Sequence, residues 1–311
     1  MGLGIKQATV FIALCVTTFV AAQNPGVQLS GTFENYYFAK QQKRGAQHRI
    51  TWMQLTAEVN PHLRFVATEQ QRISANSLDE TYGEFEHGGT TLRAGVMRRT
   101  IGFGDWAELY YTGFIAFPMI RGEYLGDNIN LLQLDTGVQV SGGSPNLQYQ
   151  ASLVDSARSS RQFFPQKLDH AIARIQTAKG PFIIGASGFK QVVGSDESKV
   201  RIYGLDIRWT APQIQIRAEA DKVDTDESTS EGYYIDTFYR PGKSTKSRLM
   251  ARAEGFRAPY VSATAVRYTF GLRQVLTENF TLSVNYGIGN RVAPANSNVG
   301  WSAQLMTSVH F

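Results

Sequence analysis

Apolar and polar residues alternate one by one in segments of about ten residues, and such segments recur along the whole chain. In Phe280–Gly289, aliphatic and aromatic residues occupy every second position, and Thr, Ser, Asn or Gly occupies the others. Successive side chains of a strand point to opposite faces, so each such segment predicts a strand with one apolar and one polar face. Gly, Pro, Asn and Asp between the segments indicate turns.

Counting these segments predicts sixteen strands. They are Val27–Phe38, Ile50–Val59, Leu63–Ile73, Thr81–Glu86, Thr91–Arg99, Ile129–Val140, Leu147–Asp155, Leu168–Thr177, Phe182–Val192, Val200–Thr210, Gln213–Lys222, Gly232–Arg240, Arg248–Phe256, Thr264–Val275, Phe280–Gly289 and Trp301–Phe311. The fourth, eighth and twelfth have the weakest patterns, which leaves 14 or 18 strands open. Connections after even-numbered strands are tight, whereas those after odd-numbered strands are generally longer and more charged, including the basic stretch Lys40–Arg49. We therefore predict an all-β, transmembrane, antiparallel up-and-down barrel of about 16 strands.

Charged residues occupy the middle of several predicted strands. Arg267 and Arg273 share one face of their strand, and Tyr268 and Phe270 share the other. A charged side chain facing lipid costs roughly 2–4 kcal/mol at the membrane midplane, so the charged faces are expected to line the interior. A barrel of 16 to 18 strands is wide enough to leave an aqueous channel. The pattern therefore predicts a pore with a charged wall.

The first residues, 1–22, are predicted to be a cleaved signal peptide. Lys6 precedes an apolar core at Ala8–Val20, and small residues end at Ala22. A membrane anchor would need a longer apolar run. The single cysteine, Cys15, follows Leu14, which is too large for the usual lipoprotein cleavage site. Residues 23–311 are then one barrel domain without cysteine, whose stability comes from its topology rather than from disulfides.

The connection Ile101–Asn128 is the longest in the predicted barrel and contains seven aromatic residues. Long segments without regular structure are often functional, and exposed aromatic residues need a surface to pack against. Asp105 and Glu108 have capping-box spacing for a short helix. The lone Gly-x-Gly at Gly102–Gly104 is interpreted as loop flexibility rather than as a nucleotide motif.

In this layout, in the strand–long loop–strand around Gly102 and in its terminal Phe311, the chain resembles bacterial outer-membrane porins. It is similar to the 16-stranded general porins and to the phosphate-selective porin O and P-like family. The resemblance implies that the third loop folds into the lumen and narrows it. It implies passive diffusion of small hydrophilic solutes and ions across the outer membrane, with weak anion selectivity. Few wall lysines leave phosphate specificity open.

The resemblance also implies a set of pore residues. Candidates for the constriction and its selectivity are Arg93, Arg99, Asp105, Glu108, Arg121, Glu123, Asp127, Arg248, Arg252, Arg267 and Arg273. Phe311 would be the assembly signal read by the barrel-assembly machinery after export by the secretion machinery. A homotrimer in contact with outer-membrane lipid, with small anions or polar solutes in transit, is implied as well.

Other functions find little support in the sequence. The 31 basic and 26 acidic residues give a net charge of +5 without the clustering expected for nucleic-acid binding. The five histidines show no metal-ligand spacing, and neither a nucleophile elbow nor a phosphate loop occurs. No enzyme activity, cofactor or metal is predicted. An outer-membrane barrel protease or phospholipase, with a site assembled only in space, and a plugged structural barrel remain as alternatives.

Overall fold

The structure of the chain is a computed structural model. It describes residues 26–40, 43–72, 75–103, 112–115, 117–122, 131, 134–155, 167–191, 200–242, 246–258, 263–290 and 300–310. For residues 29–40, 43–53, 69–72, 75–79 and 300–310, it describes the backbone alone. The predicted signal peptide, 1–22, lies outside these residues.

Sixteen strands occur among the described residues. They are β1 (Val27–Lys40), β2 (Lys43–Asn60), β3 (Leu63–Arg72), β4 (Ala75–His87), β5 (Thr90–Arg98), β6 (Leu134–Ser144), β7 (Leu147–Asp155), β8 (His170–Lys179), β9 (Phe182–Gln191), β10 (Arg201–Thr210), β11 (Ile214–Asp224), β12 (Thr229–Tyr239), β13 (Ser247–Arg257), β14 (Ala265–Val275), β15 (Phe280–Gly289) and β16 (Gly300–His310). The short helix α3 (Met119–Gly122) lies between β5 and β6. Within this part of the chain, no helix is long and apolar enough to cross a membrane.

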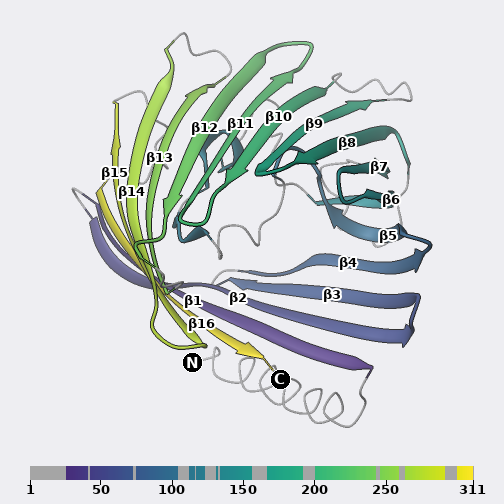
Figure 1. Ribbon diagram of the computed structural model, residues 1–311, viewed down its shortest axis with the longest axis horizontal. Helices are drawn as coiled ribbons and strands as arrows, with labels where there is room; N and C mark the ends of the chain where they lie inside the picture. Colours follow the sequence, from purple (N-terminus) through teal and green to yellow (C-terminus); the bar gives the residue numbers. More distant parts are fainter. Residues whose placement is uncertain are drawn as a thin grey trace.

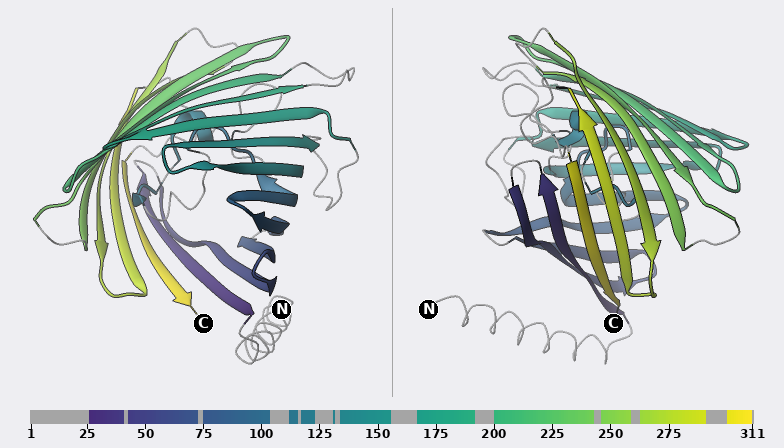
Figure 2. Two further views of the ribbon diagram at one scale, coloured as in Figure 1. Left: turned by 45° about the vertical axis from the view of Figure 1, so that its right-hand side comes forward. Right: turned by 90° about the vertical axis from the view of Figure 1, so that its left-hand side faces the viewer.

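Each strand pairs antiparallel with its neighbours in sequence, and the ring closes where β1 pairs with β16. The closing ladder runs from Ser30 opposite His310 to Ala39 opposite Trp301. Figure 1 shows the strands side by side around one ring, with β1 next to both β2 and β16, and Figure 2 shows their tilt from two other sides. Closure leaves no unpaired sheet edge, so backbone groups are satisfied within the sheet. The predicted antiparallel up-and-down architecture is confirmed.

The two faces of the wall differ in the way that the alternation predicts. On β10, Leu205 and Ile207 are exposed on the outer face, whereas Asp206 between them is buried on the inner face. On β14, Tyr268 and Phe270 are exposed, and Arg267 is buried. Large apolar side chains thus cover the outside, and charged side chains point inward, as predicted.

Several boundaries differ from the prediction. The prediction of a loop at Lys40–Arg49 is wrong, because β1 continues to Lys40 and β2 begins at Lys43. The glycines expected to form a turn after β6 are instead paired within β6, where Gly142 lies opposite Tyr149. Backbone ladder hydrogen bonds, to which polar residues and glycine contribute, extend strands beyond their apolar stretches. The predicted contrast of loop lengths also fails after three odd-numbered strands. The connections β1–β2 and β3–β4 are only 41–42 and 73–74, and β11–β12, 225–228, is shorter than β12–β13, 240–246.

Candidate functional site

The described part of the segment between β5 and β6 lies inside the barrel (Figure 1). Its apolar residues are almost fully buried against inward-facing side chains of the wall. Ile101, Met119, Ile120 and Leu131 pack with a cluster from β7–β14. Phe114 packs separately against Phe238 on β12 and Met250 on β13. Burial of these side chains holds the segment on one side of the interior, because each contributes about 1.5–3 kcal/mol of hydrophobic stabilisation.

Polar wall side chains bind the backbone of this segment directly. Glu219 on β11 accepts a hydrogen bond from Phe103 N at 3.0 Å, and Glu254 on β13 accepts one from Met119 N at 2.5 Å. Asn285 on β15 accepts from Ile115 N at 3.2 Å and donates to Gly113 O at 3.1 Å. Further bonds join Gly102 N to Ser187 Oγ and Arg267 Nη2 to Phe117 O. The wall therefore supplies hydrogen-bonding partners to a segment that has little regular structure of its own.

Arg121, the third residue of α3, forms an ion pair with Glu219 that anchors the loop to the wall. Its guanidinium donates to Glu219 Oε1 and, at 2.6 Å, to Ile101 O. Glu219 also accepts from Tyr234 Oη at 2.9 Å. Although burial opposes the charge of Arg121, the adjacent Glu219 carboxylate raises its pKa above the usual value. Arg121 therefore stays charged, and it joins α3 both to Ile101 and to the wall.

Two glycines of the loop allow its backbone to lie close to side chains of the wall. Gly102 has φ +55°, and a Cβ there would lie 2.2 Å from Glu219 Oε1. Gly113 has φ +88°, and a Cβ there would lie 2.8 Å from Cβ of Arg273. The interpretation of Gly102 as a source of flexibility is wrong, because its left-handed backbone and lack of a side chain fit it to one packed position.

The predicted basic group on β13 and β14 divides into two pairs. Arg252 forms an ion pair with Asp236 at 2.6 Å, and Arg267 forms one with Glu254 at 2.6 Å. Both arginines are buried, and Arg252 Cζ lies 4.1 Å from the ring centroid of Phe114 in the loop. By contrast, Arg248 and Arg273 are opposite one another on the two strands and are less buried. Arg252 and Arg267 support the loop, and Arg273 also packs beside Gly113 of the loop.

Arg93 and Arg99 also occupy different environments. Arg99 is buried and forms a bidentate pair with Asp135, with both N–O distances at 2.9 Å. Arg93 is partly exposed and shares the buried Glu84 carboxylate with Arg64. Arg93 also lines both of the cavities described below.

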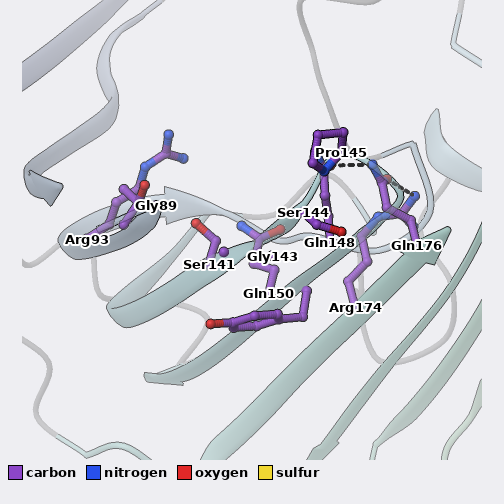
Figure 3. A pocket seen from close by; sticks show the side chains of 13 residues that line it. Gly89, Arg93, Ser141, Gly143, Ser144, Pro145, Gln148, Gln150, Arg174 and Gln176 are labelled. Atoms are coloured by element: carbon purple, nitrogen blue, oxygen red, sulfur yellow. Dashed lines mark hydrogen bonds between the residues drawn. The ribbon is translucent and has the colours of Figure 1, made fainter. Parts of the chain in front are cut away.

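Two cavities lie chiefly along β4–β8, and the smaller one also reaches β10. The smaller, about 390 Å³, extends from Gly102 and Phe103 of the loop to Gln139, Gln150 and Arg208 on the wall. The larger, about 630 Å³, extends to Pro145 at the turn that joins β6 and β7. In Figure 3, Arg93 and the hydrogen-bonded Gln148–Gln176 pair lie at opposite ends of the larger cavity. Both cavities are lined by Arg93, Gln150, Arg174 and Gln176.

Some predicted residues lie outside the described part of the chain. They are Asp105, Glu108, Glu123, Asp127 and Phe311. Conversely, the loop anchors Glu219, Glu254 and Asn285 and the cavity residues Arg174, Gln176 and Arg208 were absent from the predicted site. Their signal in the sequence is the inward position of each in an alternating strand. That signal does not distinguish a residue beneath the loop from one that lines open space.

No protein-family model and no curated protein sequence matches the chain. Solved structures do match over 92% of its length. OmpF of Salmonella typhi, in complex with daunomycin, matches with a TM-score of 0.69 at 10% identity over 97% of that chain. An anion-selective porin of Comamonas acidovorans gives 0.65 at 10% identity over 98%. A loop L8 deletion mutant of OmpT, an outer membrane protein of Vibrio cholerae, gives 0.65 at 11% over 99%.

At these identities the likeness concerns the fold. The chain has the fold of bacterial outer-membrane porins, and the predicted resemblance is confirmed at that level.

Proposed function

We propose that this protein is an outer-membrane porin through which small hydrophilic solutes and ions diffuse passively. The observation that carries the proposal is the asymmetric filling of the barrel. The described loop residues pack against inward-facing residues of β7–β15, while polar cavities of about 630 and 390 Å³ lie chiefly along β4–β8. A loop that covers one wall narrows a lumen without filling it, which is the geometry that a diffusion channel requires.

The charges that line the cavities support a weak preference for anions, phosphate-like ones included. Among described residues, four arginines line them (Arg93, Arg98, Arg174 and Arg208), together with one carboxylate, Glu80. A second basic cluster lies on the loop-covered side, where Arg248 is within electrostatic range of Arg273, Arg240 and Arg217. Carboxylates paired with Arg93, Arg98 and Arg174 offset much of the positive charge in the cavities, so the proposed preference for anions is small.

The outer surface supports a membrane location. Apolar side chains such as Leu205, Ile184 and Phe270 are more than half exposed on the outer face. In the proposal they contact outer-membrane lipid. Residues 1–22 are removed on export through the secretion machinery, and 23–311 form the barrel, whose last residue, Phe311, is recognised by the barrel-assembly machinery. Deletion of Phe311 is expected to lower the inserted amount while leaving the conductance of inserted molecules unchanged.

We further propose a homotrimer. The support is the fold, since one structure of the Vibrio cholerae OmpT protein with 12% identity and a TM-score of 0.64 is a trimer form. Native mass measurement of the detergent-solubilised barrel would give three copies. A single copy throughout would reject this part of the proposal without affecting the pore.

Planar-bilayer recording tests the proposed function. The purified chain, refolded until it shows the heat-resistant gel mobility of a closed barrel, is added to a bilayer in potassium chloride. Uniform conductance steps are expected, with a small reversal potential of anionic sign in asymmetric salt. Folded protein that inserts into liposomes but gives no steps would overturn the proposal.

A further inference from the structure

The two cavities share Arg93, Gln150, Arg174 and Gln176 in their linings, and together they make up a polar region that we call the amide corridor. We define it by its described lining residues Gln139, Gln148, Gln150, Gln176, Arg93 and Arg174. Thr91, Ser141 and Ser144 add hydroxyl groups to the larger cavity. The corridor is therefore rich in uncharged groups that both donate and accept hydrogen bonds.

Its polar side chains are held in place before any ligand enters. Arg174 binds both carboxylate oxygens of Asp206, at 2.5 and 2.9 Å. Arg174 also donates to Gln176 Oε1 at 3.3 Å, and Gln176 Nε2 donates to Gln148 Oε1 at 2.6 Å (Figure 3). This chain of bonds ends at Gln148, which is exposed. Groups fixed in this way lose little conformational entropy on binding.

One buried amide in the corridor has unused bonding capacity. Gln139 is only 3% exposed and donates from Nε2 to Ser152 Oγ at 3.2 Å. Within the part of the chain that the structure describes, its Oε1 is buried and has no hydrogen-bond partner. Gln139 lines the smaller cavity. A buried acceptor without a partner is costly, and a ligand hydroxyl in the cavity would satisfy it.

We infer that the amide corridor binds small polyhydroxylated carboxylates, that is, sugar acids. Hydroxyl groups match the amides, each of which can donate and accept at once. The carboxylate matches the excess of arginine over acidic side chains along the lining. The inference rests on the proposed porin function and names the class of solute that the same interior retains longest.

Three probe molecules separate the contribution of the hydroxyl groups to binding from that of the carboxylate. Gluconate carries both hydroxyl groups and a carboxylate, sorbitol carries the hydroxyl groups alone, and hexanoate carries the carboxylate alone. Each is added to single channels conducting in potassium chloride, and the binding constant is obtained from the current that it interrupts. Gluconate is expected to bind at least about tenfold more tightly than either of the others, because sorbitol lacks the charge-assisted hydrogen bond and hexanoate lacks the hydrogen bonds of the hydroxyl groups. Equal binding by hexanoate or by sorbitol would overturn the inference while leaving the pore intact.

Matched variants locate the site. Gln150→Leu and Gln176→Leu are expected to weaken gluconate binding by about tenfold, because each loses a hydrogen-bonding amide in the corridor. Gln215→Leu is the control, since Gln215 is on β11, outside the corridor, and bonds to Thr210. If Gln176→Leu fails to fold, Gln150→Leu alone provides the test. Equal weakening by Gln215→Leu, or none in the corridor variants, would overturn the assignment.

Calorimetry of the folded barrel in detergent keeps this test independent of conduction. If the barrel inserts without conducting, the proposed function fails. Gluconate heat that disappears in Gln150→Leu would still support a binding site in the corridor. If the barrel conducts and no gluconate binding is detected by either method, the sugar-acid inference fails and the porin function stands.

Discussion

The wall beneath the loop and the wall along the cavities contain the same kinds of inward-facing residues, but these residues have different roles. Under the loop, Glu219 and Glu254 accept hydrogen bonds from the loop backbone and from buried arginines. Along the cavities, Glu84 on β4 forms an ion pair with Arg93, and Asp206 on β10 forms one with Arg174 on β8. Both arginines line the larger cavity. An inward charge thus anchors the loop on one side and lines the passage on the other. Substitutions that separate these two roles test the comparison.

The largest effect is expected from Glu219→Gln. This change leaves the buried Arg121 guanidinium without its carboxylate, and breaking a buried ion pair costs about 3–5 kcal/mol. The loop is then expected to leave the wall, which raises single-channel conductance and adds slow current fluctuations. The control is Glu231→Gln, because Glu231 forms an exposed ion pair with Arg257, and such a pair is worth about 0–1 kcal/mol. If both variants conduct like the unmodified chain, the anchoring role of Glu219 is refuted.

A smaller effect is expected from Gly102→Ala. Gly102 and Gly180 have nearly the same backbone, with φ of +55° and +57°, so alanine at either incurs a similar left-handed strain of roughly 1–2 kcal/mol. Only at Gly102 would the new Cβ collide with Glu219, whereas nothing lies within 4 Å at Gly180. Overpacking should add about 1–3 kcal/mol at Gly102. Thermal unfolding followed by gel mobility should place Gly102→Ala below Gly180→Ala; the reverse order would contradict the packed geometry.

The smallest effect is expected from neutralising one arginine on each side. Arg93 and Arg252 each share a buried carboxylate with a second arginine, Arg64 and Arg217 respectively, so Arg93→Gln and Arg252→Gln both leave the carboxylate paired. Arg93→Gln should move the reversal potential in asymmetric salt towards cations, because Arg93 lines the passage. Arg252→Gln should leave the potential unchanged and lower stability instead. Equal shifts would mean that the loop does not separate the two environments.

Much of the barrel could be predicted from the sequence because strand alternation is a local property. The faces of β10 and β14 follow from every second residue, and the segment from Ile101 onward stands out as long and aromatic. The extension of β1 and β2 as far as Lys40 and Lys43 could not be predicted in the same way. The polar residues there do not alternate with apolar ones, and the length of the two strands is set by their backbone pairing.

The division of the interior was also beyond the reach of the sequence. Arg121, Arg252 and Arg267 were predicted to line a constriction, yet the structure buries them in ion pairs beside the loop. Arg174 and Gln176 face the cavities and were not selected. Inward alternation is the same for Arg252 and Arg267 as for Arg174 and Gln176. What distinguishes the residues beneath the loop is a contact between the loop and a distant strand. Arg121 and Glu219, for example, are 98 residues apart in the sequence.

The central claim is that solutes pass along the β4–β8 side, and thiol accessibility tests it most directly. The single cysteine, Cys15, belongs to the predicted signal peptide, so the barrel prepared without residues 1–22 has no background thiol. Gln150→Cys introduces one in the corridor, and Ser230→Cys introduces one in the buried inner face of β12. A charged, water-soluble thiol reagent should lower the current of open Gln150→Cys channels stepwise and leave Ser230→Cys channels unchanged. Rapid block of Ser230→Cys together with no response in Gln150→Cys would contradict the account.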